Sequence, residues 1–195
     1  MNENNKENSV TDITKAIPSD IYSMLDLNYK IYPAEWHVSE EYVFKIMQKN
    51  PEVYNVLRTD TGIKGIFSLF PLVKEDYESI LRGELEEKEL SEMVLDYKNP
   101  KEVYLYFISI IVDIYDVNRT HYAKKIIHGI PEELRRLEKL GIVVKEIGAV
   151  AISSDGERIL PKIGFSKQKE SLDLHNQKYP VFRASVGDVL KSITI

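Results

Sequence analysis

A strongly apolar run followed by a cationic helix start is the feature that most constrains this chain. Residues 104–112 read Tyr-Leu-Tyr-Phe-Ile-Ser-Ile-Ile-Val and carry no charge. Such a run, rich in β-branched and aromatic side chains, predicts a strand buried on both faces of a sheet. A helical pattern then begins near Arg119 and carries His121, Lys124 and Lys125 in its first turns. Because a helix N-terminus presents unpaired N–H groups and a partial positive charge, this junction predicts an anion-binding site.

Composition excludes several classes of function. The 195 residues are 43% hydrophobic and 29% charged, which is typical of a soluble globular protein and favours one domain. A formal net charge of -5 argues against a nucleic-acid partner. No apolar run approaches a membrane span and the N-terminus has no signal-peptide pattern, so we expect no membrane partner. The absence of cysteine excludes disulfides and thiolate chemistry and fits a cytoplasmic protein.

The first third of the chain predicts a tail, a strand, two helices and a hairpin. Residues 1–10 are polar and predict a flexible tail, and residues 11–17 a short strand. Ser19 and Ser39 are expected to cap two helices. Trp36 lies in the break between these helices, where it either lines a substrate pocket or fills the core. Two strands at 54–58 and 63–71 around Asp-Thr-Gly then predict a β-hairpin.

A polar stretch separates this hairpin from the apolar run. Residues 81–92 predict one or two surface helices around Gly83. We interpret the acidic charge from Glu84 to Glu92 as a solvated surface. The alternative is an acidic wall that attracts a cationic substrate.

The second half of the chain continues the alternation of helices and strands. An apolar stripe predicts a long helix from about residue 119, which Pro131 is expected to kink or break after about His128. Gly141 is a good helix stop. Further elements are expected in this order: a strand at 142–152, a short helix from 153 to 164, strands from 165 and at 178–184, and a short terminal helix or tail at 186–193.

This order of elements resembles the GNAT superfamily of N-acetyltransferases. The strand that leads into a cationic helix start and the ending Arg158-Ile-Leu-Pro-Lys-Ile-Gly-Phe165 are also similar to that family. In the family, an Arg/Gln-x-x-Gly-x-Gly/Ala loop cradles the pyrophosphate of acetyl-CoA, and a later helix ends in Tyr-x-x-x-Gly-Phe. The resemblance covers residues 11–167. It implies an α/β fold with a mixed, mostly antiparallel sheet, helices on both faces, and a single domain over residues 11–195.

The chain departs from the family pattern at several chemical positions. If Arg119 takes the place of the family arginine, Tyr122 and Lys124 stand where the loop glycines are expected. The tyrosine acid of the family falls on Leu160, and a glutamate base that some members carry falls on Ile108. These two side chains cannot transfer a proton, so the catalytic residues are left unassigned.

The resemblance also implies which residues hold acetyl-CoA, the expected co-substrate. Backbone groups at the end of the central strand would bind the pantetheine arm, and the helix start would bind the pyrophosphate. Ser153 replaces a family asparagine and keeps its hydrogen-bonding ability. The implied cofactor-binding residues are Val112, Asp113, Ile114, Arg119, Thr120, His121, Tyr122, Ala123, Lys124, Lys125 and Ser153.

Other chemistry has weaker support. Glu146, Tyr106 and Glu35 are candidate bases, but none has a distinguishing spacing. His121 either contacts a phosphate or is an ordinary exposed histidine. The four histidines lack metal-ligand spacing, so no metal is expected. The absence of a Gly-x-Ser-x-Gly elbow or a Walker loop argues against hydrolase and P-loop activities.

Two hypotheses of function follow. In the first, the chain transfers an acetyl group from acetyl-CoA to an amine of a small molecule, peptide or protein. In the second, it is a catalytically inactive GNAT-fold module for binding or interaction, as Tyr122, Lys124 and Leu160 suggest. A homodimer is compatible with either hypothesis, because the expected hairpins and C-terminal strand would be exposed.

Overall fold

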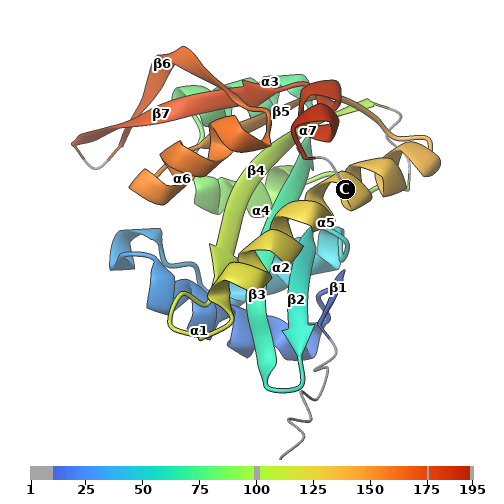
Figure 1. The fold of residues 1–195 in the computed structure, drawn as a ribbon. Coiled ribbons are helices and arrows are strands. Elements are labelled where there is room, and N and C mark those ends of the chain that lie inside the picture. The colour runs from blue at the N-terminus through green and yellow to red at the C-terminus, as the bar shows by residue number, and fades with distance from the viewer. Residues whose placement is uncertain (1–10, 99–101, 175, 194–195) are drawn as a thin grey trace, which may run out of the picture.

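The structure is a computed structural model that describes residues 11–98, 102–174 and 176–193. The predicted tail at residues 1–10 lies outside the described residues. A seven-stranded sheet forms the centre, in the order β1-β2-β3-β4-β5-β7-β6 (Figure 1). The strands are β1 (Asp12–Lys15), β2 (Tyr54–Thr59), β3 (Gly62–Leu72), β4 (Glu102–Val112), β5 (Val143–Val150), β6 (Ser166–Leu174) and β7 (Gln177–Ala184).

The sheet is mixed, as predicted. β4 and β5 run parallel, and the other neighbouring strands pair antiparallel. β4 contains the apolar run at residues 104–112, and it lies in the middle of the sheet. In Figure 1 the hairpin of β6 and β7 extends away from the body of the molecule at the upper left.

Helices cover both faces of the sheet and bury two separate apolar cores. One face carries α1 (Ile21–Ile31), α2 (Glu40–Lys49), α3 (Lys74–Arg82) and α4 (Leu90–Met93). The other carries α5 (Arg119–Lys139), α6 (Ser154–Ile159) and α7 (Val186–Ser192), and α5 crosses the front of the sheet in Figure 1. Short 3-10 segments are η1 (Pro18–Asp20), η2 (Ala34–Trp36), η3 (Glu87–Glu89) and η4 (Leu160–Ile163). The predicted α/β class, with helices on both faces, is confirmed.

A kink or a break was predicted after about His128, and the break is wrong, because α5 runs without interruption from Arg119 to Lys139. Proline lacks the N–H that would bond four residues back, which weakens a helix locally. The side chains of Ile126, Ile130 and Leu134 lie within the core between α5 and the sheet. This tertiary packing holds the helix in place on both sides of the proline, so the missing hydrogen bond does not end it.

Of the two predicted helix caps, one is confirmed. The Ser39 hydroxyl accepts the backbone N–H of Tyr42 at 3.1 Å at the start of α2. Ser19 instead lies inside η1, and Asp20 is the residue that precedes α1. The Asp20 carboxylate pairs with Arg58 of β2 at 2.7 Å, so this helix start is fixed to the sheet by an ion pair.

The polar stretch forms the predicted surface helices, and all but one of the acidic side chains from Glu84 to Glu92 are exposed to solvent. α3 ends at Gly83, whose φ of 73° is a left-handed conformation that suits glycine. Most acidic side chains from Glu84 to Glu92 are exposed, as the solvated interpretation expected. Glu87 differs, because it is half-buried and faces the sheet, where Tyr106 of β4 contacts it.

Candidate active site

A gap between β4 and β5 is the feature from which the site is built. The two strands pair in parallel from Glu102, opposite Val143, to Tyr106, opposite Gly148. Beyond that point β5 pairs only with β7, while β4 continues to Val112 without pairing with β5. The second half of β4 therefore has β3 on one side and an open edge, here called the gap, on the other.

A β-bulge in β4 directs side chains at this point. Ser68 of β3 pairs with Ser109, but the next residue of β3, Leu69, pairs with Phe107. Ile108 is therefore an extra residue in β4, and a bulge of this kind changes the direction of the strand and of its side chains. The bulge lies just where β4 and β5 separate, so it marks the start of the gap.

Backbone groups of β4 line the gap. The N–H of Asp113 donates to the carbonyl of Lys64 at 2.9 Å, so this residue is bonded to β3. In an antiparallel ladder, residues bonded to the partner alternate with residues whose N–H and C=O point away from it. Ile110 and Val112 therefore direct their backbone groups into the gap. Val112 was among the predicted cofactor-binding residues, whereas Ile110 was not identified from the sequence.

An oxygen already contacts one of these backbone groups. The hydroxyl oxygen of Tyr32, at the end of α1, accepts a hydrogen bond from the N–H of Ile110. Burial raises the pKa of Tyr32, so its hydroxyl stays protonated at neutral pH. The Ile110 N–H is thus reachable by an oxygen atom that comes from the α1 face of the sheet.

An apolar cavity lies beneath the gap, between α1, α2 and the sheet. Its volume is about 70 Å³. Ile108 and Ile111 of β4 and Ile152, just after β5, line it, so the cavity touches both sides of the gap. Trp36 also lines the cavity and meets Tyr179 of β7 edge-on, with ring centroids 5.4 Å apart. Trp36 therefore packs against the core, as one interpretation expected, and it also forms a cavity wall; a role in a substrate pocket stays a prediction.

Glu87 places a carboxylate beside this cavity. Its Oε1 accepts the Tyr106 hydroxyl at 2.7 Å, and its backbone carbonyl accepts the hydroxyl of the cavity residue Tyr42 at 2.9 Å. Burial raises the pKa of Glu87 to about 6, although the bond from Tyr106 acts in the opposite direction. The side chain can therefore accept or release a proton near neutral pH. In the sequence its only distinguishing sign is its place between the apolar residues Leu85 and Leu90.

The base candidates from the sequence lie in other environments. Tyr106 is only 2% exposed, and its hydroxyl donates to Glu87. Glu146 accepts the Tyr77 hydroxyl at 2.9 Å and a guanidinium N–H of Arg183 at 2.7 Å, so an ion pair holds it. Glu35 is exposed in η2. Glu87, in contrast, is half-buried next to the cavity residue Tyr42, and burial raises its pKa to about 6.

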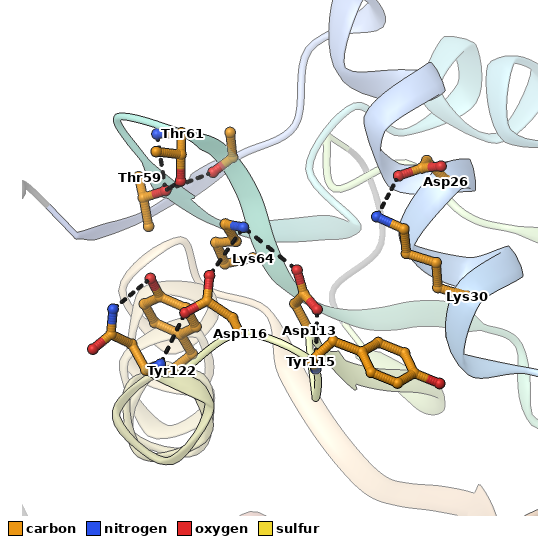
Figure 2. A network of polar contacts seen from close by, with 11 residues as sticks. Asp26, Lys30, Thr59, Thr61, Lys64, Asp113, Tyr115, Asp116 and Tyr122 are labelled. Atoms are coloured by element: carbon orange, nitrogen blue, oxygen red, sulfur yellow. Dashed lines mark hydrogen bonds and ion pairs between the residues drawn. The ribbon is translucent and has the colours of Figure 1, made fainter.

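In the loop between β4 and α5, two aspartate carboxylates accept hydrogen bonds from backbone N–H groups of the same loop (Figure 2). The Asp113 carboxylate accepts the N–H of Tyr115 at 3.2 Å, and the Asp116 carboxylate accepts the N–H of Asn118 at 2.8 Å. Lys64 of β3 pairs with both carboxylates, at 3.4 and 3.0 Å. The bonds from Asn118 and Lys64 lower the pKa of Asp116, which therefore stays ionised. Two amides that could face a phosphate are thus occupied by the chain itself.

The predicted residues at the start of α5 divide between two sides of the helix. His121, Lys124 and Lys125 border a hollow of about 510 Å³ together with Asp12 of β1. β1 lies on the side of β4 opposite to β5, so these three side chains lie away from the gap. Arg119, Thr120 and Ala123 fall on the other side of the helix by its 3.6-residue period, toward β5. The N–H groups of Thr120 and His121 belong to the first turn and have no partner within the helix.

Four further motif positions have structural roles in this chain. Tyr122 is buried against the apolar core beneath α5, with its hydroxyl 3.5 Å from the Asn118 amide nitrogen. Leu160, at the position of the family tyrosine, is an apolar side chain buried in η4. Ser153 caps α6, and its hydroxyl accepts the N–H of Gly156 at 3.1 Å. Gly164 has a φ of 95°, and a Cβ there would lie 2.6 Å from a backbone oxygen, which explains why glycine occupies the position.

Comparison with solved structures identifies the fold. The loading GNATL domain of CurA from Lyngbya majuscula matches with a TM-score of 0.69 at 9% identity, over 91% of this chain and 98% of that one. GphF, a GNAT-like decarboxylase in complex with isobutyryl-CoA, matches with a TM-score of 0.62 at 13% identity, over 90% and 99%. Arabidopsis thaliana Naa50, in complex with the bisubstrate analogue CoA-Ac-MVNAL, matches with a TM-score of 0.56 at 10% identity, over 90% and 98%. The chain has the GNAT fold, as its sequence had suggested.

Sequence comparison adds no closer relative. No protein-family model and no curated protein matches the chain. Within the described residues there is no cluster of three or more metal-ligating side chains. In the same part of the chain, no helix combines the length and apolar character that crossing a bilayer requires.

Proposed function

We propose that this chain is an N-acyltransferase that moves an acyl group from acetyl-CoA to an amine. The observation that carries the proposal is the gap, where Ile110 and Val112 direct backbone groups toward the place that a thioester arm would take. Two structures of the same fold are complexes with isobutyryl-CoA and with a CoA bisubstrate analogue, which supports a CoA thioester as the donor.

In the proposed mechanism the backbone binds the donor and Glu87 handles the proton. The N–H of Ile110, which now bonds the Tyr32 oxygen, binds the thioester carbonyl and stabilises the negative charge that develops on it. An amine in the apolar cavity attacks from the α1 face. The Glu87 carboxylate accepts the proton that the amine loses, for which a pKa of about 6 is well placed.

The phosphates of the donor are assigned to the start of α5. The unpaired N–H groups of Thr120 and His121 provide donors, and the helix dipole favours an anion there. Arg119 adds a positive charge on the side of the helix that faces β5. Asp113 and Asp116 oppose this binding through their charge, and Lys64 offsets part of it.

A ligand titration followed by an assay of transfer tests this function. A ligand that binds only the folded chain raises the melting temperature by mass action, so acetyl-CoA and CoA should each produce a saturable rise. Release of CoA thiol should then depend on an added amine. Glu87→Gln should abolish that release and leave the rise in melting temperature intact, because Glu87 lies next to the cavity residue Tyr42 and is assigned the proton of the acceptor, with no part in binding the donor.

A catalytically inactive binding module is the second candidate, favoured by the aspartates of the β4–α5 loop. Their carboxylates occupy the N–H groups of Tyr115 and Asn118, which a pyrophosphate would otherwise approach. This candidate predicts that neither acetyl-CoA nor CoA changes the melting temperature at millimolar concentration. It would then replace the transferase proposal.

A further inference from the structure

An unpartnered oxygen on a residue that lines the apolar cavity indicates the chemistry of the acceptor. The side-chain Oδ1 of Asn28, on α1, is buried and has no hydrogen-bond partner, and Asn28 lines the cavity. A buried acceptor without a donor is costly, so such an atom calls for a ligand that supplies one. The other non-aromatic polar residues of the lining, Ser68 and Ser109, are hydrogen-bonded to each other, with the Ser109 hydroxyl donating to Ser68 at 2.9 Å.

The rest of the cavity limits the body of that ligand. No charged side chain is among the described residues that line it, and its walls are aromatic and aliphatic. One water-sized probe needs roughly 10–15 Å³, so a cavity of about 70 Å³ holds a ligand of roughly five to seven non-hydrogen atoms. A carboxylate or a second ammonium on the ligand would be buried without a partner, which is strongly unfavourable.

We infer that the acceptor is a small primary amine with an uncharged apolar body, and that Asn28 binds its N–H. This inference rests on the proposed transferase function and specifies its substrate class. Asn28 Oδ1 accepts one N–H of the amine, while the body packs among the aromatic walls that include Tyr32 and Trp36. Tyr42 joins the cavity to Glu87, which lies next to it.

The transfer step balances with groups already named. The neutral amine nitrogen forms a bond to the carbonyl carbon of the thioester, and the C–S bond breaks. The electron pair of that bond leaves with sulfur as the CoA thiolate. The proton that nitrogen loses passes to Glu87 and then to the thiolate, so the products are an amide and CoA. Asn28 does not change its protonation and acts as a binding residue.

A matched pair of amines tests the substrate class. Valine is isobutylamine that bears a carboxylate, so the two differ only in this group, whose charge and added size the cavity cannot accommodate. Putrescine, within the size limit, tests the charge separately. With acetyl-CoA as the donor, isobutylamine should release CoA thiol, and valine should react at least about a hundredfold less well in kcat/KM. Putrescine, which carries a second ammonium, should be poor for the same reason. Comparable or faster release with valine or putrescine would overturn the inference.

The variant Asn28→Leu separates a binding role from a structural one. It removes the unpartnered oxygen at similar size, so the melting temperature should rise, whereas a structural asparagine would lower it on replacement. The KM for isobutylamine should rise about tenfold while the affinity for CoA stays the same. A lower melting temperature, or an unchanged KM, would contradict the assignment. Asn28→Asp, which is nearly isosteric, serves as a second variant and should bind isobutylammonium more tightly.

Two outcomes distinguish this inference from the function on which it rests. If no amine releases thiol and CoA does not bind, the transferase proposal fails. Isobutylamine should then still stabilise the wild type and not Asn28→Leu, and equal stabilisation or none would also sink the cavity assignment. If isobutyryl-CoA binds more tightly than acetyl-CoA and Asn28→Leu strengthens that preference, the acyl group occupies the cavity and the amine assignment is wrong.

Discussion

The carboxylate of Glu87 should destabilise the fold whenever it is ionised. Burial raises its pKa from 4.5 to about 6, so in the intervening range the folded chain holds a proton that the unfolded chain releases. The free energy of unfolding therefore falls as pH rises through this window, and it recovers fully below about 4.5. A difference of about 1.5 in pKa corresponds to about 2 kcal/mol, an upper limit because Glu87 is only half-buried.

The substitution Glu87→Gln isolates this charge. Glutamine keeps an oxygen to accept the Tyr106 hydroxyl, so the packing and the hydrogen bond are retained. At about pH 7.5 the variant should be more stable than the wild type by up to about 2 kcal/mol, and at about pH 4 the two should be equal. For a chain of this length the gain corresponds to a rise in melting temperature of up to about 4–8 °C.

Urea unfolding at the two pH values measures the difference. Glu92→Gln provides the control, because it removes an exposed carboxylate from the same polar segment and should change stability by no more than about 0.5 kcal/mol. If Glu87→Gln matches this control at both pH values, the carboxylate is solvated and the reasoning fails. If it is less stable at the higher pH, a favourable partner holds the charge. A variant that gains stability and loses acyl transfer would identify Glu87 as a group kept for function.

Two further predictions use pairs of variants on α5. Arg119→Glu should weaken acetyl-CoA binding at least about tenfold in a thermal-shift or calorimetric titration, because it places a negative charge beside the phosphates. Lys125→Glu makes the same charge change on the side facing β1 and should leave the affinity nearly unchanged. Glu133→Ala should lower the free energy of urea unfolding by about 2 kcal/mol, because Lys15 at 2.7 Å and Arg136 at 2.8 Å each lose a bond to a buried carboxylate. The exposed neighbour Glu132→Ala should cost less than about 0.5 kcal/mol.

The architecture was predictable because its signals are local. The apolar run of β4, the turn between β2 and β3, and the cap at Ser39 each depend on residues close together in the chain. The break at Pro131 failed for the opposite reason. A proline rule considers one missing hydrogen bond, whereas the surrounding residues of α5 are held by contacts with strands that are distant in sequence.

The candidate site was less predictable because its parts meet only in three dimensions. Glu87 belongs to the segment that joins β3 and β4, and its carboxylate contacts Tyr106 of β4. Nothing in the acidic run of the sequence distinguishes this one carboxylate, which turns inward, from its exposed neighbours. The unpartnered state of Asn28 depends on what α1 packs against. The residue pattern after the apolar run predicted the start of α5, but the helical period and the strand order decide that Arg119 and Lys125 face different sides.

In the proposed transferase function, binding of the donor and binding of the acceptor rest on different kinds of structure. Backbone groups of Ile110 and Val112 form the donor side, and they persist through changes of side chain as long as the bulge and the gap are kept. Side chains form the acceptor side, and two of them, Glu87 and Asn28, are individually unfavourable in the free protein. Folding alone would select against a buried carboxylate of raised pKa and a buried oxygen without a donor. A ligand that satisfies both would remove both costs, so we expect binding of the amine to stabilise this chain more than its size alone would suggest.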